Sequence, residues 1–248
     1  MAYYDDPQFQ YSDFWSSREY EHRSELIALD QLLGGRKFTT AVDIGGGFGR
    51  LTRWLAGRCQ KVYLVEPSVK MRQLARKKLG QSPRIFIRAG QAQDTNLPKS
   101  CAELVIMVRV LHHLPNPGPA IEEIRRILKP KGLVVVEFAN SLHFMARIKS
   151  WLTGRPILPG PVEKRHPGNI AAGTIPYVNH HPVAVQKQLL RQGFRILKIL
   201  SVSNFRKPVV KKLIPINVLL GLESRSQESL AALYFGPSIF ILAQKIDN

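Results

Sequence analysis

The sequence predicts an α/β protein built on a doubly wound, mostly parallel sheet. Between residues 41 and 138, short apolar runs alternate with amphipathic stretches, which is typical of a parallel sheet covered by helices. The runs are continuously apolar, and this pattern indicates strands buried on both faces. The first run leads directly into the glycine-rich segment 45–49, which lies at the edge where open α/β sheets bind ligands.

Seven apolar runs predict the strands. Five of them precede residue 140 and two follow it, at 41–45, 62–66, 84–89, 104–108, 133–138, 194–203 and 238–246. Apolar residues at helical spacing predict the helices between them, after the glycine-rich segment, after the capping residue Ser68, over 121–128 and over 182–192. Gly193 is the expected end of the last of these helices.

We expect one domain over residues 1–248. Residues 1–37 are the predicted N-terminal lid segment and residues 38–139 the cofactor-binding core. Two cap insertions are predicted at 140–181 and 204–235, and the end of the sheet at 182–203 and 236–248. The first insertion is basic and rich in proline and glycine, and it contains no clear periodic element. We expect both insertions to cover the functional edge of the sheet.

The net charge is +18, from 36 lysines and arginines against 18 acids. Residues 141–213 hold thirteen of these bases and the single acid Glu163, a net of +12. Such a surface favours an anionic substrate, an anionic membrane or RNA as partner, and a solvated basic surface is the alternative. Stacking aromatics are not interleaved with the bases, which disfavours RNA.

Only two cysteines, Cys59 and Cys101, are present. This number excludes a disulfide framework and a thiolate zinc site and indicates a reducing compartment. The first residues are acidic and aromatic, unlike a signal peptide, so we expect a cytoplasmic protein, with peripheral membrane association as an option. No metal is predicted.

The glycine-rich segment reads Asp43-Ile-Gly45-Gly-Gly47-Phe-Gly49. Glycine there permits positive φ and lets a ligand approach the backbone. The second strand ends in Glu66, where a carboxylate can accept both hydroxyls of a ribose. Together these features predict a nucleoside-containing cofactor, and the alternative is a tight turn with a solvated glutamate.

Three stretches resemble the class I S-adenosylmethionine-dependent methyltransferases, in the group that includes the ubiquinone and menaquinone methylases. They are VDIGGGFGRLTRWLA, VYLVEPS and AGQAQDTNLPKSCAELVIMVRVLHHLPNPGPAIEEIRRILKPKGLVVVE. The resemblance covers about residues 38–140 and is weaker around HPVAVQKQLLRQGFRI. It implies a Rossmann-like sheet of seven strands with the last one antiparallel, and S-adenosyl-L-methionine as cofactor.

The resemblance also implies roles for nine residues in cofactor binding. Asp43 and the loop glycines would hold the methionine end, Glu66 the ribose, and the remaining residues the adenosine; the full set is Asp43, Gly45, Gly47, Gly49, Glu66, Pro67, Met71, Gln91 and Ala92. The family usually has an acid where Gln91 stands, and the Gln91 amide oxygen can still accept a hydrogen bond from the adenine amino group.

Methyl transfer needs a positioned acceptor and, where that acceptor must lose a proton, a base. Arg109 and His113 follow the fourth strand, whose carboxyl end faces the donor methyl in this family. His113 could be the base and Arg109 could hold a carboxylate or phosphate; alternatively, Arg109 pairs with an acid and the histidine belongs to a turn. His180 is a third candidate, and His181, just before a proline, has a stronger alternative as a loop end.

The aromatic residues ahead of the first strand, Tyr11, Phe14, Trp15 and Tyr20 with Arg18, predict either a lid over the cofactor or a packed entry helix. The favoured function is methyl transfer to a small or lipophilic acceptor. An RNA methyltransferase that uses residues 141–213, and a non-catalytic nucleoside-binding module of the same fold, are the alternatives. The oligomeric state is open.

Overall fold

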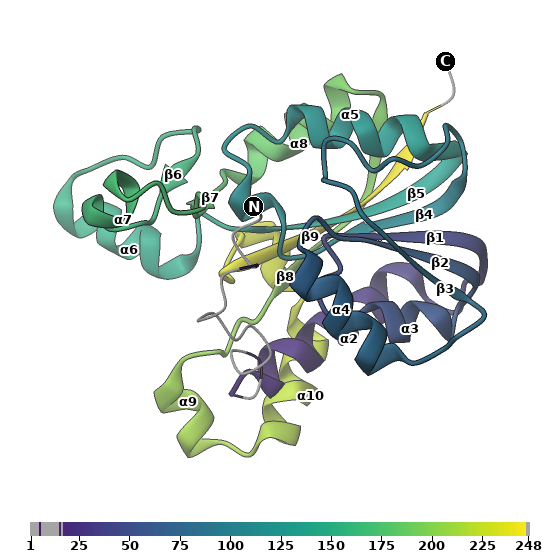
Figure 1. Ribbon diagram of the computed structural model, residues 1–248. Helices are drawn as coiled ribbons and strands as arrows, with labels where there is room; N and C mark the ends of the chain where they lie inside the picture. The colour runs from purple at the N-terminus through teal and green to yellow at the C-terminus, as the bar shows by residue number, and fades with distance from the viewer. Residues whose placement is uncertain (1–4, 6–14, 16, 247–248) are drawn as a thin grey trace.

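The computed structural model describes residues 5, 15 and 17–246, and its centre is one seven-stranded sheet (Figure 1). The order of the strands across the sheet is β3-β2-β1-β4-β5-β9-β8. Their bounds are Phe38–Ile44 (β1), Cys59–Val65 (β2), Ile85–Arg88 (β3), Ala102–Met107 (β4), Leu128–Ala139 (β5), Phe194–Val202 (β8) and Ser238–Lys245 (β9). All seven strands predicted from the apolar runs are present.

The pairing confirms the mostly parallel sheet with an antiparallel last strand. Strands β1 to β5 pair in parallel, and β9 lies antiparallel between β5 and β8. Strand β5 begins at Leu128 rather than at residue 133, because Leu128 already pairs with Ala102 before a register shift. The carboxyl ends of the parallel strands therefore meet at one edge, together with the start of β9.

Helices cover both faces of the sheet. On one face lie α5 (Gly118–Ile127) and α8 (Pro182–Arg191), whose buried residues share a core with β1, β4, β5 and β9. On the other lie α2 (Glu19–Leu33) and α3 (Thr52–Ala56), and α4 (Val69–Leu79) runs on the same side in Figure 1. Strands covered on both sides need apolar residues on both faces, which explains their continuous apolar runs.

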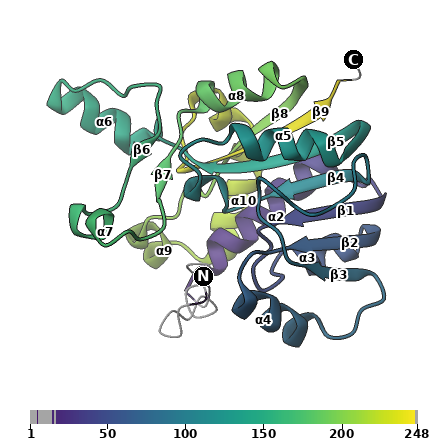
Figure 2. The same ribbon diagram turned by 45° about the horizontal axis from the view of Figure 1, so that its top comes forward.

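The two insertions form separate lobes, the first to the left of the sheet and the second below it next to α2 (Figure 1), and Figure 2 shows the first lobe from another side. The first holds α6 (Phe144–Thr153), α7 (Pro167–Ala171) and the antiparallel pair β6 (Val162–Glu163) and β7 (Val178–Asn179). The sequence predicted no regular element there. Helix α6 buries none of its residues, yet Phe144, Ile148 and Trp151 recur at helical spacing, a pattern from which the helix could have been predicted.

The second lobe holds α9 (Pro208–Leu213), α10 (Ile216–Ser226) and a short 3-10 helix over Ser229–Leu233. Helix α10 packs on α2 through Tyr20, Leu219 and Leu220. The buried Tyr20 hydroxyl donates to the Glu223 carboxylate at 2.6 Å, and it accepts from the backbone N–H of Phe205. Tyr20 is therefore packed between helices, in agreement with the entry-helix alternative.

Among the described residues, every helix is too short or too polar to cross a bilayer.

Candidate functional site

A cavity of about 300 Å³ opens at the edge where β1, β2 and β4 end. Nine of the twelve predicted site residues line it, and the structure therefore brings together residues from four separate loops. They are Gly45, Gly47, Glu66, Pro67, Met71, Gln91, Ala92, Arg109 and His113. Asp43, Gly49 and His180 are not among its lining residues. Gln93, Val110, Leu114 and Ile175 line it as well and were not predicted.

The glycine loop forms one wall of the cavity. Gly45 has φ +65°, and a Cβ atom there would lie 2.3 Å from Val110 Cγ2, so only glycine fits. Gly49 has a different reason to be glycine, because a Cβ at φ +85° would lie 2.5 Å from Leu79 Cδ1 of α4. Gly49 thus lets the loop pack on α4, while Gly45 and Gly47 face the cavity.

Glu66 lies directly after β2 and is only 4% exposed. Its Oε2 accepts from the Gly47 N–H at 3.0 Å, and its Oε1 accepts from the Ser68 N–H at 2.9 Å. Burial raises the pKa of this carboxyl, although the two hydrogen bonds oppose that shift. Each carboxylate oxygen has a second lone pair, so Glu66 can accept from two further donors in the cavity, as vicinal ribose hydroxyls require.

Asp43 is the last but one residue of β1, just before the glycine loop, and is 2% exposed. Its Oδ2 accepts from the Thr52 hydroxyl at 2.6 Å, and burial raises its pKa to about 6. Asp43 lines a small neighbouring cavity of about 30 Å³ that shares Gly45, Gly47 and Arg109 with the main one. It is therefore adjacent to the main cavity, on the side of the glycine loop.

The opposite wall has the character of a base-binding surface. Met71 is buried at the start of α4, and Ala92 is also buried. Gln91 is exposed, and its backbone exchanges hydrogen bonds with Asp94, which fixes the turn. Within the described chain the Gln91 side-chain amide makes no hydrogen bond, so its oxygen and its NH₂ are both available to a ligand.

Arg109 lines the cavity and is paired with Glu25, the alternative that the sequence left open. Glu25 on α2 is fully buried and accepts from Arg109 Nε at 2.7 Å. Its other oxygen lies 2.6 Å from Arg50 Nη2. Burial alone would raise the pKa of Glu25, but the two guanidinium groups outweigh it and lower that pKa. The pairing with Glu25 was not predicted from the sequence, because 84 residues separate Glu25 from Arg109.

A second buried carboxylate fixes the backbone of Arg109. This residue has φ +63°, an uncommon conformation for a side-chain-bearing residue, and its N–H donates to Glu137 Oε2 at 2.8 Å. Glu137 is 1% exposed on β5 and also accepts from the Ser238 hydroxyl. Burial raises the pKa of Glu137, and Arg109 opposes the shift. The turn that leads from β4 to His113 is therefore anchored at its first residue.

His113 ends a short 3-10 helix, Leu111–His113, and lines the cavity. Its Nδ1 lies 2.9 Å from the carbonyl oxygen of Pro176, which can only accept, so Nδ1 carries the proton and Nε2 the lone pair of the neutral ring. Burial lowers the pKa of His113 despite this hydrogen bond. Its ring centre lies 3.9 Å from that of His112, with the two rings tilted by 54°, and the Tyr177 ring centre lies 6.4 Å away.

His180 lies behind this turn. Its Nε2 is 2.9 Å from the carbonyl oxygen of Leu111, and its backbone joins Ala139 and Ser141 at the end of β5. The side chain is buried, and burial lowers its pKa. His180 thus connects the first insertion to the turn that carries His113. His181 precedes the first residue of α8, and its side chain makes no capping hydrogen bond.

The described residues of the N-terminal segment contact the site. The guanidinium of Arg50 lies 3.8 Å from the Trp15 ring centre, and Asp5 accepts from the Ser68 hydroxyl at 2.6 Å, next to Glu66. Tyr11 and Phe14 lie outside the described residues. No group of three histidine, cysteine or acidic side chains suited to a metal occurs in the described ranges.

Comparison with known proteins explains this arrangement. A family model described as a methyltransferase domain matches residues 42–136. Residues 42–136 therefore match the methyltransferase family, whose class I members the sequence resembles. The matched residues begin within β1 and end within β5, and they include the glycine loop, Glu66 and the turn of His113. S-adenosylmethionine is the cofactor of this class, and the cavity fits it because Glu66 faces a wall of glycine backbone.

Individual curated proteins that are similar to this chain are also named methyltransferases. An uncharacterized methyltransferase of Geobacillus is 31% identical over 46% of this chain and 55% of its own length. A ubiquinone/menaquinone biosynthesis C-methyltransferase of Hydrogenovibrio crunogenus is 31% identical over 44% of this chain and 46% of its own. The chain thus spans about half the length of these curated relatives.

The same fold extends over the whole chain. A solved S-adenosylmethionine-dependent methyltransferase of Thermotoga maritima, described as a possible histamine N-methyltransferase, superposes with a TM-score of 0.66 at 19% identity. The match covers 98% of each chain. The fold is therefore shared beyond residues 42–136.

Proposed function

We propose that this protein is an S-adenosylmethionine-dependent methyltransferase that acts on a small or lipophilic acceptor. The observation that carries the proposal is the buried Glu66 carboxylate, which faces a cavity walled by the Gly45–Gly47 backbone. A carboxylate at the end of the second strand is suited to a ribose, and the glycine loop lets the ligand lie against the backbone.

Different residues around the cavity would bind different parts of the cofactor. Glu66 would accept from the ribose hydroxyls, and Gln91 would bind the adenine amino group beside Met71 and Ala92. The methionine end would lie along Gly45 and Gly47, toward Asp43. The raised pKa of Asp43, about 6, follows from burial, and a cationic sulfonium ligand nearby would favour its charged form. The bound cofactor supplies an electrophilic methyl group.

His113 is the proposed base for an acceptor that must lose a proton. Its Nδ1 donates to Pro176, which orients the ring, and Nε2 is then the atom that takes the proton. Burial lowers its pKa, so the ring is neutral at pH 7. Arg109 is the proposed contact for an anionic group at the cavity, and Glu25 and Glu137 position it. His180 would act through the turn that carries His113.

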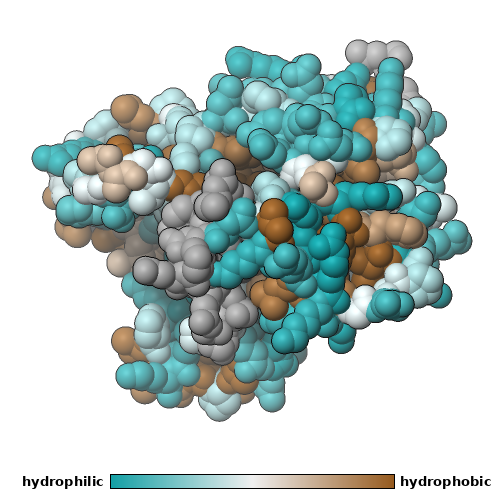
Figure 3. Space-filling view, in the orientation of Figure 1, coloured by the Kyte–Doolittle hydropathy of each residue, from teal (hydrophilic) through white to brown (hydrophobic). Residues whose placement is uncertain are grey.

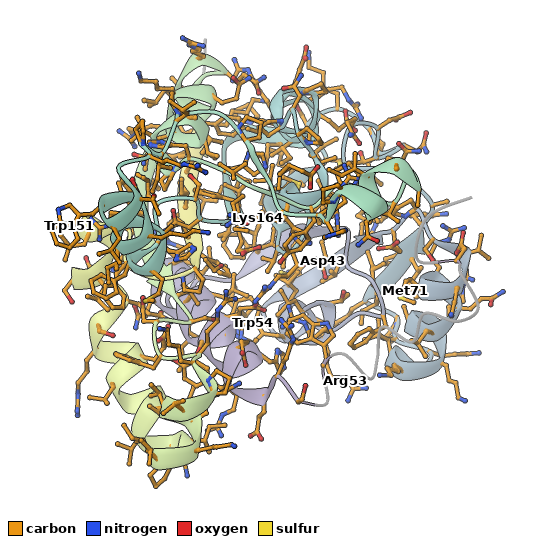
Figure 4. All side chains as sticks on the ribbon, turned by 90° about the vertical axis from the view of Figure 1, so that its left-hand side faces the viewer. Asp43, Arg53, Trp54, Met71, Trp151 and Lys164 are labelled. Carbon is orange, nitrogen blue, oxygen red and sulfur yellow. The ribbon has the colours of Figure 1, made fainter. Side chains whose placement is uncertain are left out.

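We propose a lipophilic acceptor partly because both lobes expose apolar side chains among hydrophilic ones (Figure 3). Trp151 and Leu152 on α6 are 82% and 70% exposed, and Leu213 on α9 is 77% exposed. Figure 4 shows Trp151 at the outer edge of the molecule, away from Asp43 and Met71. Exposed apolar groups with neighbouring bases suit the surface of an anionic membrane.

We therefore also propose peripheral contact with anionic lipid. Vesicles of phosphatidylglycerol should sediment the protein, and vesicles of phosphatidylcholine should not. The double change Trp151→Ser with Leu152→Ser should weaken this sedimentation, whereas Val69→Ser, a change at an apolar residue that is half exposed on α4, should not. Equal binding to both lipids would contradict the proposal.

The enzymatic proposal is tested with labelled cofactor. Purified protein is incubated with methyl-labelled S-adenosylmethionine and a fractionated cell extract, and label is expected in lipid or small-molecule fractions. Glu66→Ala should abolish labelling, while the exposed α5 acid in Glu122→Ala serves as the control. Label in RNA would overturn the acceptor class, and saturable binding without any transfer would favour a non-catalytic nucleoside-binding module.

A further inference from the structure

A second, larger hollow lies between the two lobes and the start of α2. Its volume is about 760 Å³, and we refer to it as the lobe groove. It is lined by residues that follow β5 and β8, by residues that precede β9, and by the start of α2. It therefore opens at the same edge of the sheet as the cofactor cavity.

Basic side chains dominate the charge of the lobe groove. Arg18, Arg206, Lys207 and Lys211 line it, against the single acid Glu21. Glu21 is paired with Lys211 at 3.2 Å. In the described part of the chain, no carboxylate lies within ion-pair distance of Arg206 or Lys207; the nearest polar partner of Lys207 Nζ is Met145 Sδ at 3.1 Å.

The bases act on one another electrostatically. Burial lowers the pKa of His143 in this groove, and Arg206, Lys164 and Lys207 lower it further. Partial desolvation of its guanidinium likewise lowers the pKa of Arg206, and the positive charge of Arg109 lowers it further. Four bases gathered around one acid favour the binding of an anion.

The remaining wall of the lobe groove is apolar. Phe144 at the start of α6 stacks on Phe235 with ring centres 4.9 Å apart, and Phe205 and Val210 line the other side. An apolar wall beside the bases Arg206 and Lys207 suits a ligand that carries both an acidic group and a hydrocarbon body.

Three consecutive residues separate the lobe groove from the cofactor cavity. Ile175 lines the cavity, the Pro176 carbonyl accepts from His113, and Tyr177 lines the groove. The Tyr177 ring lies 5.0 Å from His112 and 6.4 Å from His113. A ligand in the groove therefore lies next to the proposed base, with only this short segment between.

We propose that the lobe groove is the acceptor site and that it binds an amphipathic anion, such as a carboxylate with a hydrocarbon chain. Arg206 and Lys207 bind the acidic group, the phenylalanines contact the chain, and the other end of the molecule points past Tyr177 toward His113. The assignment to the acceptor rests on the proposed methyltransferase function, whereas the binding of the anion does not.

The test compares laurate, below its micellar concentration, with its uncharged methyl ester, below its solubility limit, by calorimetry on the full-length protein. Laurate should bind saturably and methyl laurate at least about 10-fold more weakly, since charge-assisted hydrogen bonds are lost. The double change Arg206→Gln with Lys207→Gln should remove this preference. Lys212→Gln on α9 carries the same type of charge change outside the groove and should leave laurate binding unchanged.

A second titration, with S-adenosylmethionine on each variant, verifies folding and separates the two proposals. Unchanged cofactor binding with lost laurate binding supports the lobe groove. Laurate binding without any cofactor binding leaves the groove in place and contradicts the proposed function. Equal affinity for laurate and methyl laurate, or wild-type laurate affinity in the folded double variant, overturns the groove proposal.

Discussion

Glu25 provides the sharpest test of how the site is held together. Its buried carboxylate lies between Arg50 and Arg109, whose side chains are 12% and 16% exposed. Glu25→Gln removes the charge but keeps the shape, and it leaves two guanidinium groups facing each other. Breaking a buried ion pair on one side costs about 3–5 kcal/mol, a large part of the roughly 5–15 kcal/mol by which a domain is stable.

The assay is urea unfolding followed by circular dichroism, supported by thermal melts. For a chain of this size the loss corresponds to a fall in Tm of about 6–20 °C. Glu19→Gln is the matched control, because Glu19 lies on the same helix, is 65% exposed and, among the described residues, pairs with Arg23 at 3.3 Å. Its expected cost is below about 1 kcal/mol.

The pH dependence adds a second readout. The pKa of Glu25 is lowered in the folded protein, so its contribution is complete above pH 4.5, the value of an unperturbed glutamate, and is lost as the pH falls through the folded pKa. The stability difference between wild type and Glu25→Gln should therefore shrink in acid. A Glu25→Gln protein within about 0.5 kcal/mol of wild type at pH 7 would refute this account of the site.

Two further predictions concern the cavity itself. Gly45→Ala should lower stability by at least about 1 kcal/mol and block cofactor binding, because φ is +65° and the new Cβ meets Val110; wild-type binding in calorimetry would contradict this. His113→Asn should lower the methylation rate by about 10²–10⁴-fold for an acceptor that loses a proton. Wild-type activity should decline in acid only as the pH falls through the lowered pKa of His113, below 6.5, and a limb that persists in the variant would exclude His113 as its source.

Much of the fold was predictable because the burial of an element determines where apolar residues stand in its sequence. The strands lie between two layers of helices, so each had to be a continuous apolar run, and all seven were found. Helix α6 was not predicted although Phe144, Ile148 and Trp151 recur at helical spacing, because the prolines and glycines that follow it favour a loop. The start of β5 at Leu128 depends on its pairing with Ala102, which no local pattern encodes.

The part of the candidate site that directly follows predicted strands was also predictable. The glycine loop and Glu66 follow directly from strands, so the chain itself fixes their place at the edge. The pairing of Glu25 with Arg109 depends on how α2 packs under the sheet, and the approach of Ile175 depends on the first lobe. Such contacts between distant segments carry no signal in a single sequence.

The most direct test of the central claim is calorimetric titration of S-adenosylmethionine into the wild-type protein and into Glu66→Ala. The account predicts saturable binding to the wild type, no binding of comparable strength by NAD, and a loss of at least about 10-fold in affinity on removal of the ribose-binding carboxylate. Wild-type affinity in a folded Glu66→Ala protein, or a preference for NAD, would contradict it.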